Sequence, residues 1–143
     1  MSKSVLCALE LSDAALDRKV LEQAARLAAL DDAQLDVVNV LPDFGESWVS
    51  GFFEEHHHDK AVKDTTAHLR DLCEEVLGAE RNAKVRHVVA TGTAYQEILQ
   101  VAAKAGTDLI VIGAHKPDLK DYLLGPNAAR VIRHSDCSVY VVR

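Results

Sequence analysis

The stretch DLIVIGAHKPDLKDYLLGPNAARVIRHSDCSVYVVR, residues 108–143, holds two apolar runs joined by a loop and a helical pattern. The first run, 108–113, is apolar at both alternating positions, which is typical of a strand covered on both faces. A helix that begins near Pro126 or Asn127 leads into the second run, 138–143. Two strands joined through a helix run parallel in one sheet, so this stretch predicts a right-handed parallel crossover.

The rest of the chain repeats this alternation. Three further strands are predicted at 4–10, 35–41 and 84–90. Three further helices are predicted, from Ser12 or Asp13 to about Leu30, from about Asp59 to Leu77, and from Thr93 to Gly106. This order predicts an α/β fold whose parallel sheet is covered on both faces. A chain of 143 residues has the size of one domain, so we expect a single domain over 1–143.

Composition excludes several classes of protein. A net charge of -6 and a pI near 5.6 argue against nucleic acid or an anionic membrane as the main partner. No apolar stretch approaches the roughly 20 residues that span a bilayer, so we expect a cytoplasmic protein without membrane insertion. Cys7, Cys73 and Cys137 lie in apolar runs without a CxxC pair, which favours buried reduced thiols over the alternative of a redox site.

In parallel α/β sheets, ligands bind beyond the carboxyl ends of the strands. Gly113 and Gly125 bound the loop after the fourth predicted strand, and glycine lets a backbone approach a ligand closely. His115 and Lys116 add a hydrogen-bond donor and a cation to this loop. The loop is therefore a candidate phosphate site, and an ordinary connection between strand and helix is the alternative.

The first predicted strand ends in an acidic residue, Glu10. A carboxylate at this position can accept hydrogen bonds from a ribose. The alternative is a polar strand end that faces water.

Together, these segments resemble the universal stress protein family. The resemblance rests on ALELSD (8–13), VNVLPD (38–43), TGTAYQEIL (91–99) and the stretch 108–143, and it covers essentially the whole chain. It implies a three-layer, Rossmann-like open sheet of five parallel strands in the order 3-2-1-4-5 with four helices, and a homodimer through the last strand, 138–143. It also implies a stress-response regulator that binds ATP, with or without Mg²⁺, and acts on a protein partner that the sequence does not name.

The resemblance also assigns individual residues. The implied nucleotide contacts are Ala8, Leu9 and Glu10 at the adenosine, the backbone of Val40 at the adenine edge, Gly113, His115 and Lys116 in the phosphate loop, and Gly125, Pro126, Asn127 and Ala128 at the helix terminus.

Three of these positions depart from the family pattern. Glu10 replaces an aspartate, Lys116 a glycine, and Pro126 a serine or threonine. Proline removes both a hydroxyl and an N–H donor. We therefore expect a nucleotide to bind more weakly than in a serine-bearing relative, and a nucleotide-free dimeric interaction module is the alternative.

Residues 42–58 are predicted to form an unusually long loop. Its aromatic residues, Phe44, Trp48, Phe52 and Phe53, indicate a lid or a partner-binding patch, or else an outer part of the core. The run 56–58 holds three consecutive histidines, whose side chains cannot all point one way, so we expect a solvated helix entry and no metal site.

No catalytic motif of the GxSxG, HExxH or GxxxxGK(S/T) type occurs in the sequence. We therefore expect that the protein is not an enzyme. A weak ATPase that uses magnesium with Glu10 or Asp118 remains the alternative.

Overall fold

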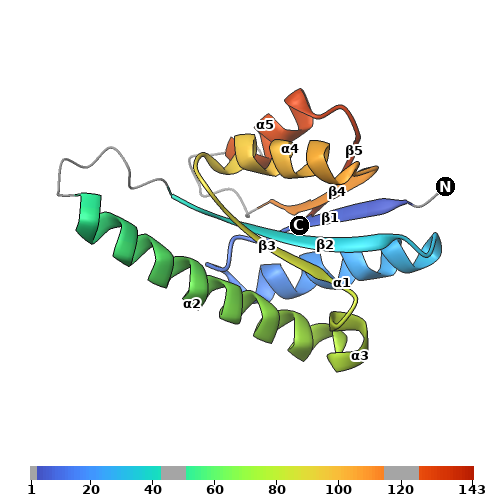
Figure 1. The fold of residues 1–143 in the computed structure, drawn as a ribbon. Helices are drawn as coiled ribbons and strands as arrows, with labels where there is room; N and C mark the ends of the chain where they lie inside the picture. Colours follow the sequence, from blue (N-terminus) through green and yellow to red (C-terminus); the bar gives the residue numbers. More distant parts are fainter. Residues whose placement is uncertain (1–2, 43–50, 115–125) are drawn as a thin grey trace.

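In a computed structural model, the chain forms a five-stranded parallel sheet in the order β3-β2-β1-β4-β5 (Figure 1). The structure describes residues 3–42, 51–114 and 126–143, and at 51–57 and 126 the backbone alone. The strands are β1 (Ser4–Ala8), β2 (Gln34–Leu41), β3 (Arg86–Thr91), β4 (Leu109–Gly113) and β5 (Ser138–Val142). The predicted fold class and strand order are confirmed.

The helices form one layer on each face of the sheet (Figure 1). One layer holds α1 (Ala14–Leu30), α2 (Gly51–Leu77) and α3 (Ala79–Asn82), and the other holds α4 (Ala94–Ala105) and α5 (Pro126–His134). The four predicted helices correspond to α1, α2, α4 and α5, and the four-residue α3 was not predicted. None of the helices among the described residues is both long enough and apolar enough to span a bilayer.

Local signals explain where the helices begin and end. Asp13 caps α1, since its side chain accepts the backbone N–H of Leu16 at 3.2 Å. Gly106 ends α4 in the left-handed conformation with φ 65°, and Gly78 follows α2 with φ 86°. Thr93 holds the cap position of α4, but its side chain makes no capping hydrogen bond.

The prediction that 42–58 is a loop was wrong for its second half. Helix α2 begins at Gly51, eight residues before the predicted Asp59. No glycine or proline interrupts the chain between Gly51 and Gly78, so nothing in the backbone chemistry stops the helix from extending. Of the predicted aromatic patch, Phe44 and Trp48 lie outside the described residues, as do the side chains of Phe52 and Phe53.

His58 differs from the solvated histidine that we expected. Its Nε2 lies 2.6 Å from Oγ1 of Thr91, in a partly buried contact between α2 and the end of β3. Within the side chains that the structure describes, no three His, Cys, Asp or Glu residues gather in a way that could hold a metal ion.

The core has two halves, one on each face of the sheet. Under α1 and α2 the sheet contributes Cys7, Val37 and Val111, and under α4 and α5 it contributes Leu6, Val38 and Ile110. Every residue of β1 is buried, which agrees with the prediction of a sheet covered on both faces.

The three thiols are free, and two of them lie in the core. Cys7 and Cys73 are fully buried, whereas Cys137 is only half-buried. Burial raises the pKa of Cys73 to about 11 and also raises that of Cys7. Both core thiols therefore stay protonated at neutral pH, and this protonation disfavours the redox alternative for them.

Candidate functional site

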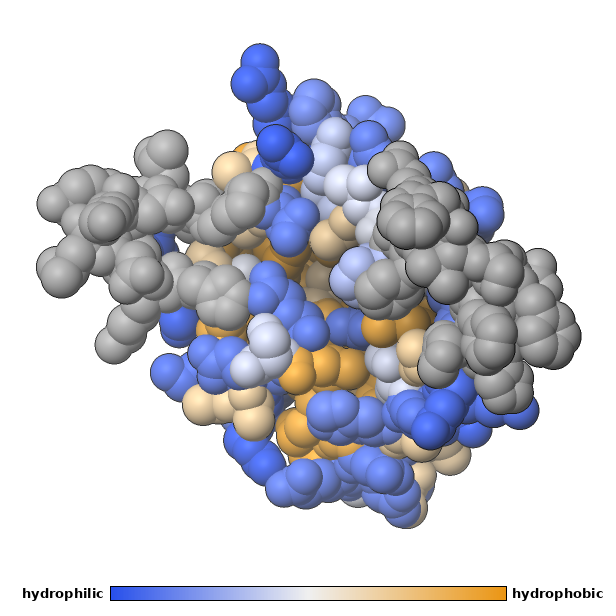
Figure 2. Space-filling model, turned by 90° about the vertical axis from the view of Figure 1, so that its left-hand side faces the viewer, coloured by the Kyte–Doolittle hydropathy of each residue, from blue (hydrophilic) through white to orange (hydrophobic). Residues whose placement is uncertain are grey.

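A cavity of about 300 Å³ opens at the carboxyl edge of the sheet, where β1 and β4 lie side by side. Its described walls come from the ends of β1, β2 and β4, from the first two turns of α1 and α4, and from the start of α5. Figure 2 looks at this edge and shows apolar surface in the middle of the face, with hydrophilic residues around it. This is the edge at which an open α/β sheet binds its ligands.

Most of the predicted contact residues that the structure describes meet at this cavity. Those that line it are Ala8, Leu9, Glu10, Val40, Gly113 and Asn127. Ala128 does not, because its side chain, 2% exposed, packs into the core under α4 and α5. Pro126 is the first residue of α5, and His115, Lys116 and Gly125 lie outside the described residues.

The turn after β1 is held by two buried polar side chains that the sequence analysis did not single out. Nδ2 of Asn39 donates to the carbonyl oxygen of Leu9 at 2.8 Å, and Oδ1 of Asp17 accepts the N–H of Glu10 at 3.2 Å. Asn39 and Asp17 are each 4% exposed, and both line the cavity. Directly after Glu10, the backbone turns at Leu11, which has a φ of 63°. A polar residue inside the apolar run of β2 was the available signal for Asn39.

Asp17 adds an unfavourable charge to this mouth. Burial raises the pKa of Asp17, the backbone N–H groups of Glu10 and Leu11 lower it, and the nearby carboxylates of Glu10 and Asp13 raise it further. The net direction is upward from the usual aspartate value. Among the described residues that line the cavity, none is basic, so its fixed side-chain charge is negative.

Helix termini provide the opposite polarity. Ser12 precedes α1, Ala94 begins α4 and Asn127 is the second residue of α5, and all three line the cavity. The first turns of helices carry free N–H groups and the positive end of the helix dipole, which favour anions. The cavity thus combines an apolar floor, a carboxylate next to β1 and helix N-termini at its mouth.

Gly113 has a packing reason to be glycine. A Cβ at this position would lie 2.9 Å from Cγ2 of Val20 and 3.1 Å from Cδ2 of Leu16. The side chains of α1 therefore already fill the space that a larger residue would need. The predicted role of Gly113 in close approach to a ligand stays a prediction.

Two histidines outside this region, His87 and His134, have structural neighbours. Nε2 of His87 lies 2.7 Å from Oδ1 of Asn82, and burial followed by the charge of Arg70 lowers the pKa of His87. His134, the last residue of α5, stacks on Tyr95 with ring centroids 6.1 Å apart. Neither His87 nor His134 lines the cavity.

Comparisons with known proteins agree with this architecture. The model of the universal stress protein family matches residues 1–143. Universal stress protein G of Shigella flexneri is 29% identical, with all of both chains covered. The structure of MJ0577 from Methanocaldococcus jannaschii has a TM-score of 0.80 at 25% identity and covers 99% of this chain and 96% of that one. A universal stress protein from Archaeoglobus fulgidus in complex with dAMP has a TM-score of 0.64 at 20% identity, covering 100% and 98%.

Proposed function

Because this chain belongs to the universal stress protein family, we propose that it is a cytoplasmic stress-response regulator that binds an adenine nucleotide in the cavity between β1 and β4. One observation carries the proposal: six residues assigned to the nucleotide by resemblance, from four strand or helix ends, line a single cavity. The dAMP complex of the Archaeoglobus fulgidus protein, which shares the fold, supports the ligand class.

In the proposed complex each part of the cavity has a role. The adenine ring packs on apolar side chains such as Ile98 and Ile112, beside the backbone of Val40. The carboxylate of Glu10 accepts the ribose hydroxyls, as acidic residues do in dinucleotide sites. The phosphates lie toward the N-termini of α4 and α5.

The remaining predicted contacts belong to the phosphate end of the proposed site. These are His115, Lys116, Gly125 and Pro126, together with the backbone of Ala128. The described lining holds Glu10 and Asp17 and no cation, so a cation is needed from elsewhere. We propose that Lys116 or a bound Mg²⁺ ion supplies this positive charge next to the phosphates of ATP.

We propose regulation and not catalysis as the role of binding. In this account nucleotide occupancy alters a homodimer and its contact with a protein partner. β5 pairs with β4 and is the last strand of the sheet order, and Tyr140 on it is 38% exposed. An unpaired strand edge is a site for pairing with another chain, so we place the dimer contact at 138–143. A monomer in size-exclusion chromatography with light scattering would contradict the dimer.

A nucleotide-free interaction module is the second candidate. The acidic lining by Glu10 and Asp17 favours it, as does Pro126, which lacks the N–H of a first helical residue. The two candidates differ in a single measurable property, the affinity for a nucleotide.

Isothermal titration of the full chain with ATP, AMP, adenosine and GTP tests the proposal. We expect one adenine ligand per chain, with a dissociation constant between about 1 μM and 1 mM, and no binding of GTP. Ala94→Phe places a large side chain at the cavity wall and should abolish binding. Ala103→Phe, on the exposed face of the same helix, is the matched control and should leave binding intact.

Either of two results would overturn the nucleotide proposal. The first is no binding of any adenine ligand at millimolar concentration, which favours the interaction module. The second is equal binding to the Ala94→Phe variant, which would place the ligand elsewhere.

A further inference from the structure

A second cavity, of about 440 Å³, lies at the amino edge of the sheet. The end of α1, the start of β2, the end of α2, α3 and the entry to β3 surround it. Figure 1 shows these segments gathered at the end of the molecule opposite the carboxyl edge. The nucleotide cavity and this amino-edge cavity share no lining residue.

Small side chains leave this space open. Four alanines contribute to its wall, namely Ala25, Ala28, Ala29 and Ala33. Leu35 and Leu77 form its deeper part and are 8% and 7% exposed. A helix that packed directly here would normally use larger apolar residues to fill the gap. The result is an apolar recess of a size common for small-molecule sites.

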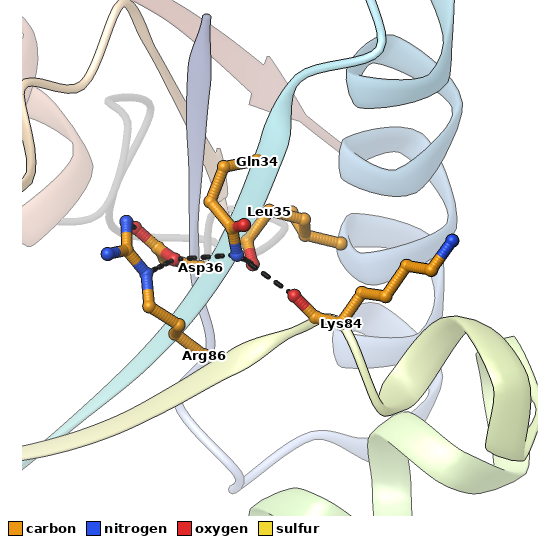
Figure 3. Close-up of polar contacts among 5 residues, drawn as sticks. All are labelled: Gln34, Leu35, Asp36, Lys84 and Arg86. Atoms are coloured by element: carbon orange, nitrogen blue, oxygen red, sulfur yellow. Dashed lines mark hydrogen bonds and ion pairs between the residues drawn. The ribbon is translucent and has the colours of Figure 1, made fainter. Parts of the chain in front are cut away.

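Two cations stand on the rim of the amino-edge cavity. Nε of Arg81 donates to the carbonyl oxygen of Leu77 at 2.9 Å, which anchors the guanidinium at the mouth. The backbone oxygen of Lys84 accepts Nε2 of Gln34 at 3.0 Å. Figure 3 shows that the side chains of Lys84 and Leu35 extend toward α1, away from Asp36 and Arg86.

The charges of Arg81 and Lys84 are not neutralised within the described residues. Among the described residues, neither Arg81 nor Lys84 forms an ion pair. Arg86, by contrast, pairs with Asp36 on the other side of the strands. The rim also carries one carboxylate, Asp32, in the turn after α1 with φ 49°. Two cations against one carboxylate leave the rim with a net positive charge.

From this arrangement we infer that the amino-edge cavity binds a small amphiphilic carboxylate. Its apolar chain contacts Ala28, Leu35 and Leu77, where each buried methylene contributes about 0.8 kcal/mol. Its carboxylate lies between Arg81 and Lys84, where charge-assisted hydrogen bonds form. A polyphosphate ligand does not fit, because most of the lining offers no hydrogen-bond donor.

Titration of the full chain with decanoate, below its micellar concentration, tests this inference. We expect one decanoate per chain, and about tenfold weaker binding of decanol, which has the same chain without the charge. Decyltrimethylammonium, which carries the opposite charge, should bind at least as weakly as decanol. These three probes separate recognition of the carboxylate from simple apolar adsorption.

Two pairs of variants locate the binding. Ala29→Phe fills the mouth from the exposed end of α1 and should abolish decanoate binding, whereas Ala67→Phe, at an exposed position of α2, should not. Lys84→Glu should weaken binding by about tenfold or more, and Lys63→Glu, an exposed charge on α2, should leave it within about twofold. Thermal unfolding of each variant checks that it folds.

Several outcomes would overturn the inference. Decanol or decyltrimethylammonium binding as tightly as decanoate would show that the rim charge is not used. Decanoate that competes with ATP, or that is blocked by Ala94→Phe, would belong to the nucleotide cavity. If the wild type does not bind decanoate and the Ala29→Phe variant dissociates a dimer, a second copy of the chain covers this surface. If the Ala29→Phe variant still binds ATP, the variant affects the amino-edge cavity alone. The decanoate proposal and the nucleotide proposal are then tested independently.

Discussion

The carboxylate of Asp17 accepts the backbone N–H of Glu10 at 3.2 Å, at the mouth of the nucleotide cavity. This contact joins the first turn of α1 to the end of β1 and fixes the residue proposed to receive the ribose. It also places two carboxylates close together, and the charge of Glu10 helps to raise the pKa of Asp17. The ionised carboxylate of Asp17 therefore lowers the stability of the folded state, by an amount that depends on pH.

Replacing Asp17 with asparagine should change how stability depends on pH. The folded pKa of Asp17 is raised, so the folded state holds its proton more tightly than the unfolded state. Ionised Asp17 therefore opposes folding fully above its folded pKa, and this penalty disappears as the pH falls below the ordinary aspartate value of 3.8. Asp17→Asn keeps an acceptor for Glu10, and its stability relative to the wild type should rise from pH 4 to pH 7.

Urea unfolding of both proteins across this pH range measures that effect. Asp64→Asn, an exposed position on α2, is the control and should run parallel to the wild type. A stability difference between Asp17→Asn and the wild type that stays constant with pH would contradict the argument.

Breaking the ion pair between Asp36 and Arg86 should be strongly destabilising. Nε and the terminal nitrogen of Arg86 lie 2.6 and 2.8 Å from the two oxygens of Asp36, whose side chain is 3% exposed (Figure 3). Hydrogen bonding to Asp36, followed by its charge, raises the pKa of Arg86. Arg86→Ala would leave a buried carboxylate unpaired, at a cost of about 3 kcal/mol. We choose the lower end of the usual range because the side chain of Arg86 is 60% exposed.

The exposed pair of Arg18 and Glu75 provides the comparison for that experiment. Their atoms are also 2.6 Å apart, but the two side chains are 45% and 65% exposed. Arg18→Ala should therefore cost less than about 1 kcal/mol in the same denaturant series. Equal losses for Arg18→Ala and Arg86→Ala would show that burial of the acid does not decide the energy.

The space beside Gly113 predicts a destabilising variant that a second change can rescue. Gly113→Ala brings a Cβ within 2.9 Å of Val20, and overpacking of this kind costs about 1–3 kcal/mol. Adding Val20→Ala removes the clashing methyl groups, so the two changes together should cost less than the sum of the two single changes. Thermal unfolding of the two single variants and the double variant measures this coupling, and strict additivity would argue against the clash.

Most of the fold, but only part of the candidate site, could be predicted from the sequence. Mainly apolar runs predicted β1, β2 and β4, and Gly106 marked the end of α4, because these signals depend on local chemistry. The start of α2 was missed although Ser50, a residue type that often caps helices, directly precedes Gly51 in the sequence.

Within the site, what was missed depends on tertiary contacts. Asp17 and Asn39 hold Glu10 and Leu9, yet they lie seven and 30 residues away from them in the chain. Their roles follow from how α1 and β2 pack against β1, and single-residue chemistry does not encode that. The side chain of Ala128 lies away from the cavity for a related reason. Neighbouring residues in the first turn of a helix face different directions, so Asn127 lines the cavity while the side chain of Ala128 packs into the core.

Pro126 gives the sharpest test of the proposed phosphate end. It is the first residue of α5, where proline suits the helix but offers no N–H and no hydroxyl to an anion. Pro126→Ser restores both donors, and one hydrogen bond to a charged group is worth about 1.5–3 kcal/mol. ATP should therefore bind roughly ten- to a hundredfold more tightly to this variant in calorimetry. Adenosine, which has no phosphate, should bind both proteins equally. An ATP affinity that is unchanged or weaker would mean that the phosphates do not lie at the N-terminus of α5.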